Sequence, residues 1–178
     1  MHILFIGYGK TSARIAKQLF EQGHQISTIS RSAKTDSCAT HHVQDVHQLD
    51  LSSLAPIDWV YVLLSPDQSA IEAYQQTYLD SVGPIVTALK SHPIKRLVVV
   101  SSTRVYGENA GEQVGDDSLI HPNDPQGKIL QQMEQTYLAA YPDQCTIIRP
   151  SGIYGASVAR LEKMARSMSS YPNLHWSN

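Results

Sequence analysis

Short apolar runs alternate along the chain with longer segments in which apolar residues recur every three or four positions. The short runs have the length of buried strands, and they predict strands over residues 3–6, 25–30, 58–64, 95–101 and 145–149, with a shorter one around 42–44. The periodic segments predict helices over residues 12–22, 69–90, 127–141 and 157–169. Gly23 stands where the first helix should end, and Pro84 predicts a kink or break in the second.

This order of elements predicts an α/β protein with a Rossmann-type, doubly wound parallel sheet in three layers, α/β/α. The chain shows no internal repeat, low-complexity tract or linker, so we expect one domain over residues 1–178. Ligands of such sheets bind beyond the carboxyl ends of the strands. The candidate site residues at those ends are Gly7, Gly9, Ser30, Arg31, Leu64, Ser65, Ser101, Ser102, Arg149 and Pro150.

Composition and charge narrow the classes of function. The chain has 16 acidic and 14 basic residues and a formal net charge of −2, which disfavours a nucleic-acid partner. Hydrophobic residues make up 42% and charged residues 17%, values typical of a folded globular protein. Cys38 and Cys145 lie far apart and indicate ordinary reduced thiols. We find neither a signal peptide nor a membrane-length apolar run, so we expect a cytoplasmic protein without a membrane partner.

The loop after the first predicted strand carries the strongest local signal. It reads Gly7-Tyr8-Gly9-Lys10-Thr11-Ser12 and leads into the first predicted helix. Gly7 permits a sharp turn, Gly9 permits a diphosphate to approach the backbone, and the start of the helix supplies free N–H groups. Ser12 replaces the third glycine of the dinucleotide-binding pattern Gly-x-Gly-x-x-Gly. We interpret this loop as a dinucleotide-binding site, with a glycine turn that binds nothing as the alternative.

The same loop also resembles the end of a triphosphate-binding P-loop, at Gly9-Lys10-Thr11. That motif needs a glycine five residues before Gly9, and the chain has Leu4 there. The loop is therefore too short to wrap a triphosphate, and we disfavour an NTPase.

The end of the second predicted strand indicates which dinucleotide would bind. NAD-binding proteins place an acidic residue there, which bonds the 2′-hydroxyl of the adenosine ribose. This chain has Ser30 and Arg31 instead, and its next acidic residue is Asp36. Ser30 could hydrogen-bond a 2′-phosphate, and Arg31 could pair with it or stack on the adenine. We therefore expect NADP(H) to be preferred over NAD(H).

Two further motifs follow later predicted strands. Ser101-Ser102-Thr103-Arg104-Val105-Tyr106-Gly107 resembles the SS-x-x-VYG signature of the extended short-chain dehydrogenase/reductase family, the NAD-dependent epimerases and dehydratases that act on nucleotide sugars. Arg149-Pro150-Ser151-Gly152-Ile153-Tyr154-Gly155 resembles the RP-x-x-x-YG segment of that family. Together with the glycine loop, these motifs cover nearly the whole chain in the family's order.

The resemblance implies roles for individual residues. Ser102 matches the catalytic Ser or Thr that hydrogen-bonds the substrate oxygen, and Lys128 matches the lysine that holds the nicotinamide ribose. The family's tyrosine, four residues before that lysine, is replaced by Asp124, which is ionised at neutral pH and a poor proton donor. Tyr106 could substitute for the missing phenol, although a residue of the pocket wall is the other interpretation. The cofactor site is expected to include Tyr8, Lys10, Thr11, Ser12, Leu64, Ser65, Ser101, Lys128, Arg149 and Pro150.

Three functions are compatible with these features. The first is the NADP(H)-binding domain of an atypical epimerase/dehydratase-like protein, with hydride transfer to or from a small molecule, such as a nucleotide sugar. The second is a non-catalytic dinucleotide-binding module with a regulatory or redox-sensing role. The third is a compact flavin or quinone reductase. Family members are usually much longer, so residues from about 150 to 178 are expected to begin a truncated substrate-binding part, with the C-terminal substrate lobe largely absent.

The sequence also leaves a homodimer open. In the relatives two long helices pair in a dimer, and the matching segments here are 69–90 and 126–141. Their apolar stripes could bury such a contact or pack only on the sheet; they are Tyr78, Val82, Ile85, Met133 and Tyr137.

The histidine patch His41, His42 and His47 has only Asp45 among the acids between its members, so we expect a solvated loop and no metal.

Overall fold

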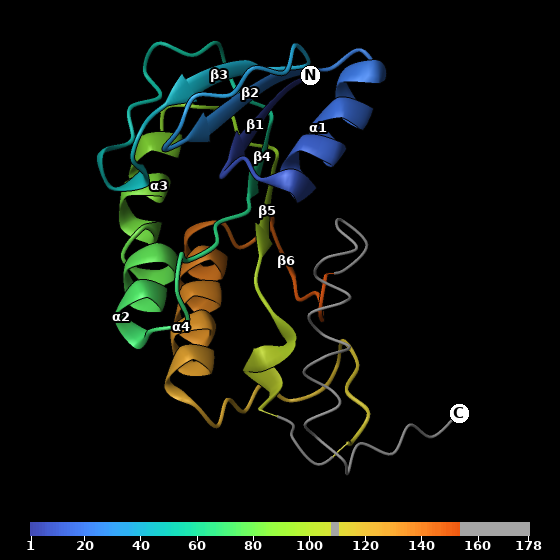
Figure 1. The fold of residues 1–178 in the computed structure, drawn as a ribbon, viewed down its shortest axis with the longest axis vertical. Coiled ribbons are helices and arrows are strands. Elements are labelled where there is room, and N and C mark those ends of the chain that lie inside the picture. The colour runs from blue at the N-terminus through green and yellow to red at the C-terminus, as the bar shows by residue number, and fades with distance from the viewer. Residues whose placement is uncertain (108–110, 154–178) are drawn as a thin grey trace.

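A computed structural model gives the fold and describes residues 1–107 and 111–153. Its centre is a six-stranded sheet with only parallel pairings and the order β3-β2-β1-β4-β5-β6 (Figure 1). The strands are β1 (His2–Ile6), β2 (Gln25–Ser30), β3 (Thr40–Val43), β4 (Trp59–Val62), β5 (Arg96–Val100) and β6 (Cys145–Ile148). The chain winds outward from β1 to β3 and then returns to place β4 beside β1. This confirms the predicted Rossmann-type sheet, with its switch point between β1 and β4.

Helices cover both faces of this sheet, which confirms the three layers (Figure 1). The helices are α1 (Lys10–Glu21), α2 (Ile71–Tyr74), α3 (Val82–Leu89) and α4 (Pro125–Ala140). A π-helical turn, η2 (Gln75–Leu79), lies between α2 and α3, and the 3₁₀ turns η1 (Val46–Gln48) and η3 (Thr103–Tyr106) follow β3 and β5. α1 packs on one face, and α3 and α4 pack on the other.

The larger core lies between the sheet and the α3–α4 layer. Alternate residues of the central strands point into it, among them Leu4, Val60 and Leu97, each fully buried. Ile85 of α3 and Leu130 of α4 close the core from outside the sheet. Each such side chain stabilises the fold by about 1.5–3 kcal/mol through removal of apolar surface from water. This packing holds the carboxyl ends of the strands in fixed positions.

The smaller core lies under α1 on the opposite face. Ile3, Phe5 and Ile26 of the sheet pack against Ala16, and the Phe5 ring stacks on Tyr61 of β4 with 4.9 Å between centroids. α1 ends as predicted, because Gly23 has a φ of +83° and the N–H of the next residue bonds back to the helix at Leu19.

The helix expected over residues 69–90 is broken in the structure, but the break precedes Pro84. The Asp80 N–H bonds to the Gln75 carbonyl at 3.0 Å, a π-type bond that ends η2. α3 then starts at Val82, so Pro84 lies in its first turn, where no intrahelical partner for an N–H is needed. The proline is therefore accommodated by a new helix start, and the sequence indicated the break but not its position.

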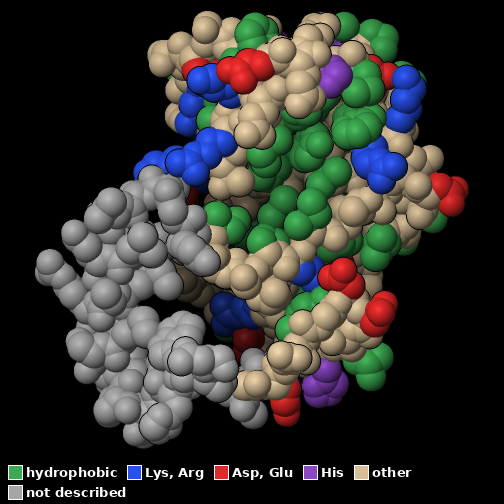
Figure 2. All heavy atoms as spheres, turned by 90° about the vertical axis from the view of Figure 1, so that its right-hand side faces the viewer, with side chains coloured by type: hydrophobic (Ala, Val, Ile, Leu, Met, Phe, Trp, Pro, Cys, Tyr) green, Lys and Arg blue, Asp and Glu red, His purple; other side chains and the backbone are tan. Residues whose placement is uncertain are grey.

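The half of the sheet beyond α1 presents apolar side chains on the same face as Phe5. Tyr61 and Val98 share this face through the register of the parallel strands, and so does Ile148, which is exposed. Figure 2, which looks onto this side of the molecule, shows hydrophobic side chains gathered across it. This face is thus only partly covered by the part of the chain that the structure describes.

Two expectations on the helices meet different outcomes. The stripe proposed for a dimer contact is buried in this chain's own core: Val82, Ile85, Met133 and Tyr137 are at most 2% exposed. Those residues pack within this chain's own core, which is the second of the two alternatives, and a homodimer itself stays a prediction. The helix expected over residues 157–169 lies outside the described residues, as do Tyr154 and Gly155 of the second motif. Within the described ranges, no helix is long and apolar enough to cross a membrane.

Candidate functional site

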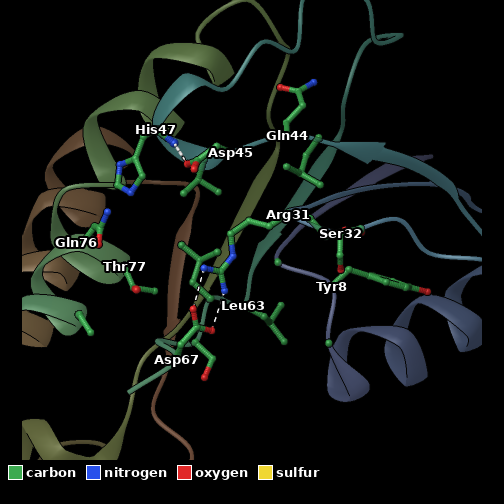
Figure 3. A pocket seen from close by; sticks show the side chains of 18 of the residues that line it. Tyr8, Arg31, Ser32, Gln44, Asp45, His47, Leu63, Asp67, Gln76 and Thr77 are labelled. Atoms are coloured by element: carbon green, nitrogen blue, oxygen red, sulfur yellow. Dashed lines mark hydrogen bonds and ion pairs between the residues drawn. The ribbon is translucent and has the colours of Figure 1, made fainter. Parts of the chain in front are cut away.

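A cavity of about 420 Å³ lies at the carboxyl ends of β1, β2 and β4, beside the switch point (Figure 3). This volume is in the range of small-molecule sites. Among the residues predicted from the sequence, its lining includes Gly7, Tyr8, Gly9, Ser30, Arg31, Leu64 and Ser65. The fold therefore brings together three of the predicted segments, which lie far apart in the sequence.

Gly7 is the turn on which the glycine loop depends. Its φ is +92°, and a Cβ there would collide with the backbone carbonyl oxygen of Leu63. Its N–H donates to the Ile29 carbonyl at 2.9 Å, so the loop is tied to β2 on one side and pressed on β4 on the other. Only glycine fits this position, because both the space and the backbone conformation exclude a side chain.

Gly9 has the opposite surroundings, because a Cβ at this position would meet nothing within 4 Å. It is the N-cap of α1 and has an ordinary extended conformation, with a φ of −104°. Among the described residues no side chain caps α1, and its first turn contains no acidic residue. The first N–H groups of the helix are thus left to an outside acceptor, and the helix dipole favours an anion there.

The residues that follow Gly9 hold the loop in place. Lys10 and Thr11 are exposed in the first turn of α1, whereas Ser12 is 1% exposed. The Ser12 hydroxyl donates to the Gly7 carbonyl at 2.8 Å. The serine in the place of the third glycine therefore ties the first turn of α1 to the start of the glycine loop.

Tyr8 lines the cavity through its backbone, because its side chain points away from it (Figure 3). The phenol donates to Asp36 at 3.0 Å and lies 3.6 Å from the Cys38 sulfur, while the Cys38 thiol donates to the same carboxylate at 2.8 Å. The His41 ring lies 5.1 Å from the Tyr8 ring and 3.4 Å from the Asp36 carboxylate. Burial, and then the bonds to Cys38 and Asp36, raise the pKa of Tyr8. This cluster ties the glycine loop to the connection between β2 and β3.

The two residues expected to select the cofactor lie at the end of β2. The Ser30 hydroxyl donates to the Ser32 carbonyl at 2.7 Å, so it is engaged within its own loop. The Arg31 guanidinium reaches across the cavity to Asp67, with N–O distances of 2.9 and 3.0 Å (Figure 3). Both side chains of this pair are exposed, at 67% and 70%. Arg31 is therefore placed on the cavity as predicted, but with a partner that the sequence did not reveal.

Several lining residues were missed by the sequence analysis. The side of the cavity opposite Tyr8 is formed by Asp45 and His47 beyond β3 and by Gln76 and Thr77 of η2 (Figure 3). Asp45 could have been found from the sequence, because it directly follows the short strand predicted around 42–44. In the structure the Gln44 N–H donates to the Ser30 carbonyl at 3.1 Å, so this segment continues the edge of the sheet beside β2. The η2 residues had no such signal, because their place depends on how the broken helix packs.

The remaining predicted residues form a second cluster at the ends of β5 and β6. Ser101 and Thr103 bond through their N–H groups to the carbonyls of Ile148 and Pro150. The Ser101 hydroxyl is buried and finds no hydrogen-bond partner in the described part of the chain. The Ser102 hydroxyl oxygen accepts the Arg104 N–H at 3.2 Å, which leaves the hydroxyl proton free to donate.

Asp124, in the place of the family's tyrosine, is the N-cap of α4. Its carboxylate accepts the Gly127 N–H at 2.7 Å and the Arg104 Nε at 2.9 and 3.0 Å. Partial burial opposes ionisation, but the Gly127 and Arg104 bonds outweigh it and hold the pKa of Asp124 below its usual range. The Arg104 guanidinium in turn lies 5.6 Å from the centre of the Tyr74 ring. Asp124 is therefore a charged helix cap, not a proton donor at neutral pH.

Lys128 lies one turn into α4 and is exposed. Its N–H bonds to the Asp124 carbonyl at 3.1 Å, but the ion partner of the Asp124 carboxylate is Arg104. Gln126, on the same turn, donates to the Ser69 carbonyl at 2.9 Å and joins the start of α4 to the loop after β4.

Arg149, after β6, is held by groups inside the protein. Its guanidinium donates to both carboxylate oxygens of Glu134, the closest at 2.8 Å, and the two side chains are 19% and 2% exposed. It also donates to the Tyr106 hydroxyl at 3.2 Å. Arg149 thus joins β6, α4 and η3, and neither it, Pro150, Ser102 nor Lys128 belongs to the described lining of the cavity.

No group of three or more His, Cys, Asp or Glu side chains in residues 1–107 and 111–153 is arranged to hold a metal ion. His41 of the histidine patch bonds to Thr28 at 2.7 Å and to the Asp36 carbonyl at 3.0 Å. These contacts place it in the Tyr8 cluster described above.

Comparison with known proteins agrees with this architecture. The model of the NAD dependent epimerase/dehydratase family matches residues 7–172. Because that match includes the glycine loop and both later motifs, the chain belongs to the NAD-dependent epimerase/dehydratase family. No curated protein sequence matches the chain significantly.

Solved structures show the same fold. UDP-glucuronic acid 4-epimerase from Bacillus cereus, in complex with NAD, has a TM-score of 0.74 at 21% identity, over 87% of this chain and 58% of its own. A protein of Methylobacillus flagellatus classed as an NAD-dependent epimerase/dehydratase has a TM-score of 0.75 at 28% identity, over 96% and 61%. A UDP-galactose 4-epimerase has a TM-score of 0.72 at 16% identity, over 94% and 64%. The chain thus spans less than two thirds of the length of each of these structures.

Proposed function

We propose that this chain binds a nicotinamide adenine dinucleotide, with the diphosphate on the first turn of α1 and the adenosine in the cavity. The observation that carries the proposal is Gly9. The position has open space where a side chain would be, and it is both the N-cap of α1, without a side-chain cap, and part of the cavity lining. Backbone N–H groups and a helix dipole suit a diphosphate, and the absence of a Cβ lets it approach. The relatives whose structures contain NAD support this assignment.

Replacement of Gly9 by valine tests the proposal. The φ of −104° and the empty surroundings accommodate a side chain, and because valine is a poorer N-cap than glycine we expect the fold to be kept with a loss of about 1 kcal/mol in the free energy of unfolding. The added methyl groups would occupy the diphosphate site, and we expect dinucleotide affinity to fall at least about tenfold in calorimetric titrations. Gly115→Val is the matched control, because Gly115 is equally open but lies outside the cavity lining. Equal affinity in wild type and Gly9→Val would overturn the proposal.

We further propose that NADP(H) is the preferred form. Support comes from Arg31 and Lys34, two cationic side chains on the cavity at and after the end of β2. A guanidinium recognises a phosphate through two parallel hydrogen bonds. Titration of the wild-type protein with NADPH and NADH decides the matter, and tighter binding of NADH would contradict the preference.

The chemistry that we propose is hydride transfer on a small molecule of the nucleotide-sugar class, the class of molecule named for the UDP-sugar epimerases above. A bound nicotinamide ring would supply or accept the hydride. Ser102 has a hydroxyl proton to offer a substrate oxygen, and Lys128, exposed on α4, is available to the nicotinamide ribose. Tyr106 accepts a hydrogen bond from Arg149 and keeps its own proton, so it is our candidate for the missing phenol.

One observation favours a second function, a dinucleotide-binding module without catalysis. Asp124 is a helix cap paired with Arg104, so the position of the family's proton donor has a structural role here. Incubation with NADPH and simple carbonyl compounds, and with NADP⁺ and a panel of sugar nucleotides, separates the two when both the cofactor and the sugars are analysed. Consumption of NADPH or conversion of a sugar that is lost in Ser102→Ala and Tyr106→Phe supports the enzyme. Cofactor binding without turnover on the whole panel supports the module.

A further inference from the structure

The Arg31–Asp67 ion pair crosses the mouth of the cavity. Arg31 follows β2 and Asp67 follows β4, the two strands that flank β1 and its glycine loop. The guanidinium presents two nitrogens to two carboxylate oxygens, at 2.9 and 3.0 Å, in a bidentate arrangement (Figure 3). The bridge therefore lies on the same side of the sheet edge as the proposed adenosine site.

This pair is exposed, unlike the other two arginine–carboxylate pairs at the strand ends. Its side chains are 67% and 70% exposed, whereas those of Arg149 and Glu134 are 19% and 2% exposed. An exposed ion pair gains little net free energy, because water solvates both partners well when they separate. It can therefore exchange partners when a stronger anion arrives.

A carboxylate and a phosphate bind a guanidinium in the same way, through its two parallel N–H groups. Each offers two oxygens to the two parallel N–H groups of the fork, and one fork binds only one of them fully at a time. The other charged side chains on this part of the cavity are Lys34 and Asp45, and Asp45 bonds to the His47 N–H instead of to Arg31. Asp67 is thus the anion that already occupies the fork of Arg31.

We propose that Asp67 determines cofactor specificity by competing with a ribose 2′-phosphate for the Arg31 guanidinium. When the dinucleotide carries that phosphate, Arg31 releases Asp67 and pairs with the phosphate. When the dinucleotide lacks it, the ion pair stays closed over the adenosine ribose. The inference rests on the proposed dinucleotide site, and it makes the preference for NADP(H) smaller than Arg31 alone would give.

The loop that carries Asp67 is held in position from its other side. Gln126 of α4 donates to the Ser69 carbonyl at 2.9 Å, two residues after Asp67. This bond joins the loop to α4 and involves neither Asp67 nor Arg31, so replacement of Asp67 should change the competition without breaking it.

The test measures dissociation constants of NADPH and NADH for wild type, Asp67→Asn, Arg31→Gln and the double variant. Asparagine keeps the shape of Asp67 and removes its charge. We expect Asp67→Asn to tighten NADPH binding about threefold to fivefold, the range that an exposed ion pair allows, and to change NADH binding less than about twofold. In the Arg31→Gln background, Asp67→Asn should leave NADPH binding within about twofold, because the fork for which it competes is absent.

The outcomes separate this inference from the proposed function. Equal tightening of NADPH and NADH would mean that Asp67 acts only as a nearby charge, and an effect that persists without Arg31 would mean the same; either overturns the inference. An unchanged NADPH-to-NADH ratio in Asp67→Asn also overturns it, while the dinucleotide site stands if Gly9→Val weakens both cofactors. Failure of both cofactors to bind any of the proteins overturns the site and the inference together.

Discussion

Three arginines follow strands of the sheet, and each has a carboxylate partner, yet the surroundings of the pairs differ. Arg149 and Glu134, beyond β6, are nearly enclosed by the protein; Arg104 and Asp124, beyond β5, are about one third exposed; Arg31 and Asp67, at the cavity, are mostly exposed. A buried pair is needed for stability, because loss of one partner leaves the other charge buried and uncompensated. Exposure leaves a pair free to exchange. Along the carboxyl edge of the sheet, the exposure of these pairs thus rises from β6, where the pair stabilises the fold, to β2, where the pair can exchange partners.

Among substitutions in these three pairs, we expect the largest loss of stability at Glu134. Glu134→Ala leaves the Arg149 guanidinium without its anion in a largely dry site, and we expect a loss of about 3–5 kcal/mol in the free energy of unfolding, measured in urea. Glu134→Gln, which keeps the shape and one acceptor, should lose less. Near-wild-type stability of Glu134→Ala would show that the enclosed pair is not structural.

An intermediate effect is expected at Asp124. Asp124→Ala removes both the N-cap of α4 and the partner of Arg104, so we expect a loss of about 1–2 kcal/mol at pH 7. Asp124→Asn retains a good cap and loses only the charge, so it should fall between wild type and the alanine variant.

The effect of Asp124 should also depend on pH. Its pKa is lowered in the folded protein, so the carboxylate stabilises the fold fully above its unfolded pKa of about 3.9 and loses this contribution as the pH falls through the lower, folded value. The difference in unfolding free energy between wild type and Asp124→Ala should therefore be constant from about pH 7 to 5 and shrink below about pH 4. A difference that does not change between pH 6 and 3 would mean that the charge of Asp124 contributes nothing.

The smallest effect on stability is expected at Asp67. Because its pair with Arg31 is solvated, Asp67→Asn should leave the urea midpoint within the error of measurement. The consequence of the substitution should appear only in the ratio of NADPH to NADH affinity. A clear fall in stability would place this pair with the structural ones and weaken the case for exchange.

The sequence predicted the parts of this molecule that depend on neighbouring residues. Strand positions and the glycine turn follow from local apolar runs and from backbone conformations open only to glycine, and the parallel pairing follows from the alternation of strands and helices. The partner of Arg31 could not be predicted, because Asp67 is brought to it by the pairing of β1 with both β2 and β4. The replacement of the family's tyrosine by Asp124 was likewise visible in the sequence, but the ion pair of Asp124 with Arg104, which lies 20 residues away, depends on the fold.

The contrast between Gly7 and Gly9 has a use beyond this chain. Gly7 is demanded by the protein itself, through its backbone angle and the carbonyl of Leu63, whereas nothing in the described protein demands a glycine at position 9. A homologous sequence that retains the first glycine but carries a bulky residue in the place of the second would have kept this architecture and given up the dinucleotide. If the proposed site is right, the two positions together sort relatives into those that bind the cofactor and those that keep only the fold.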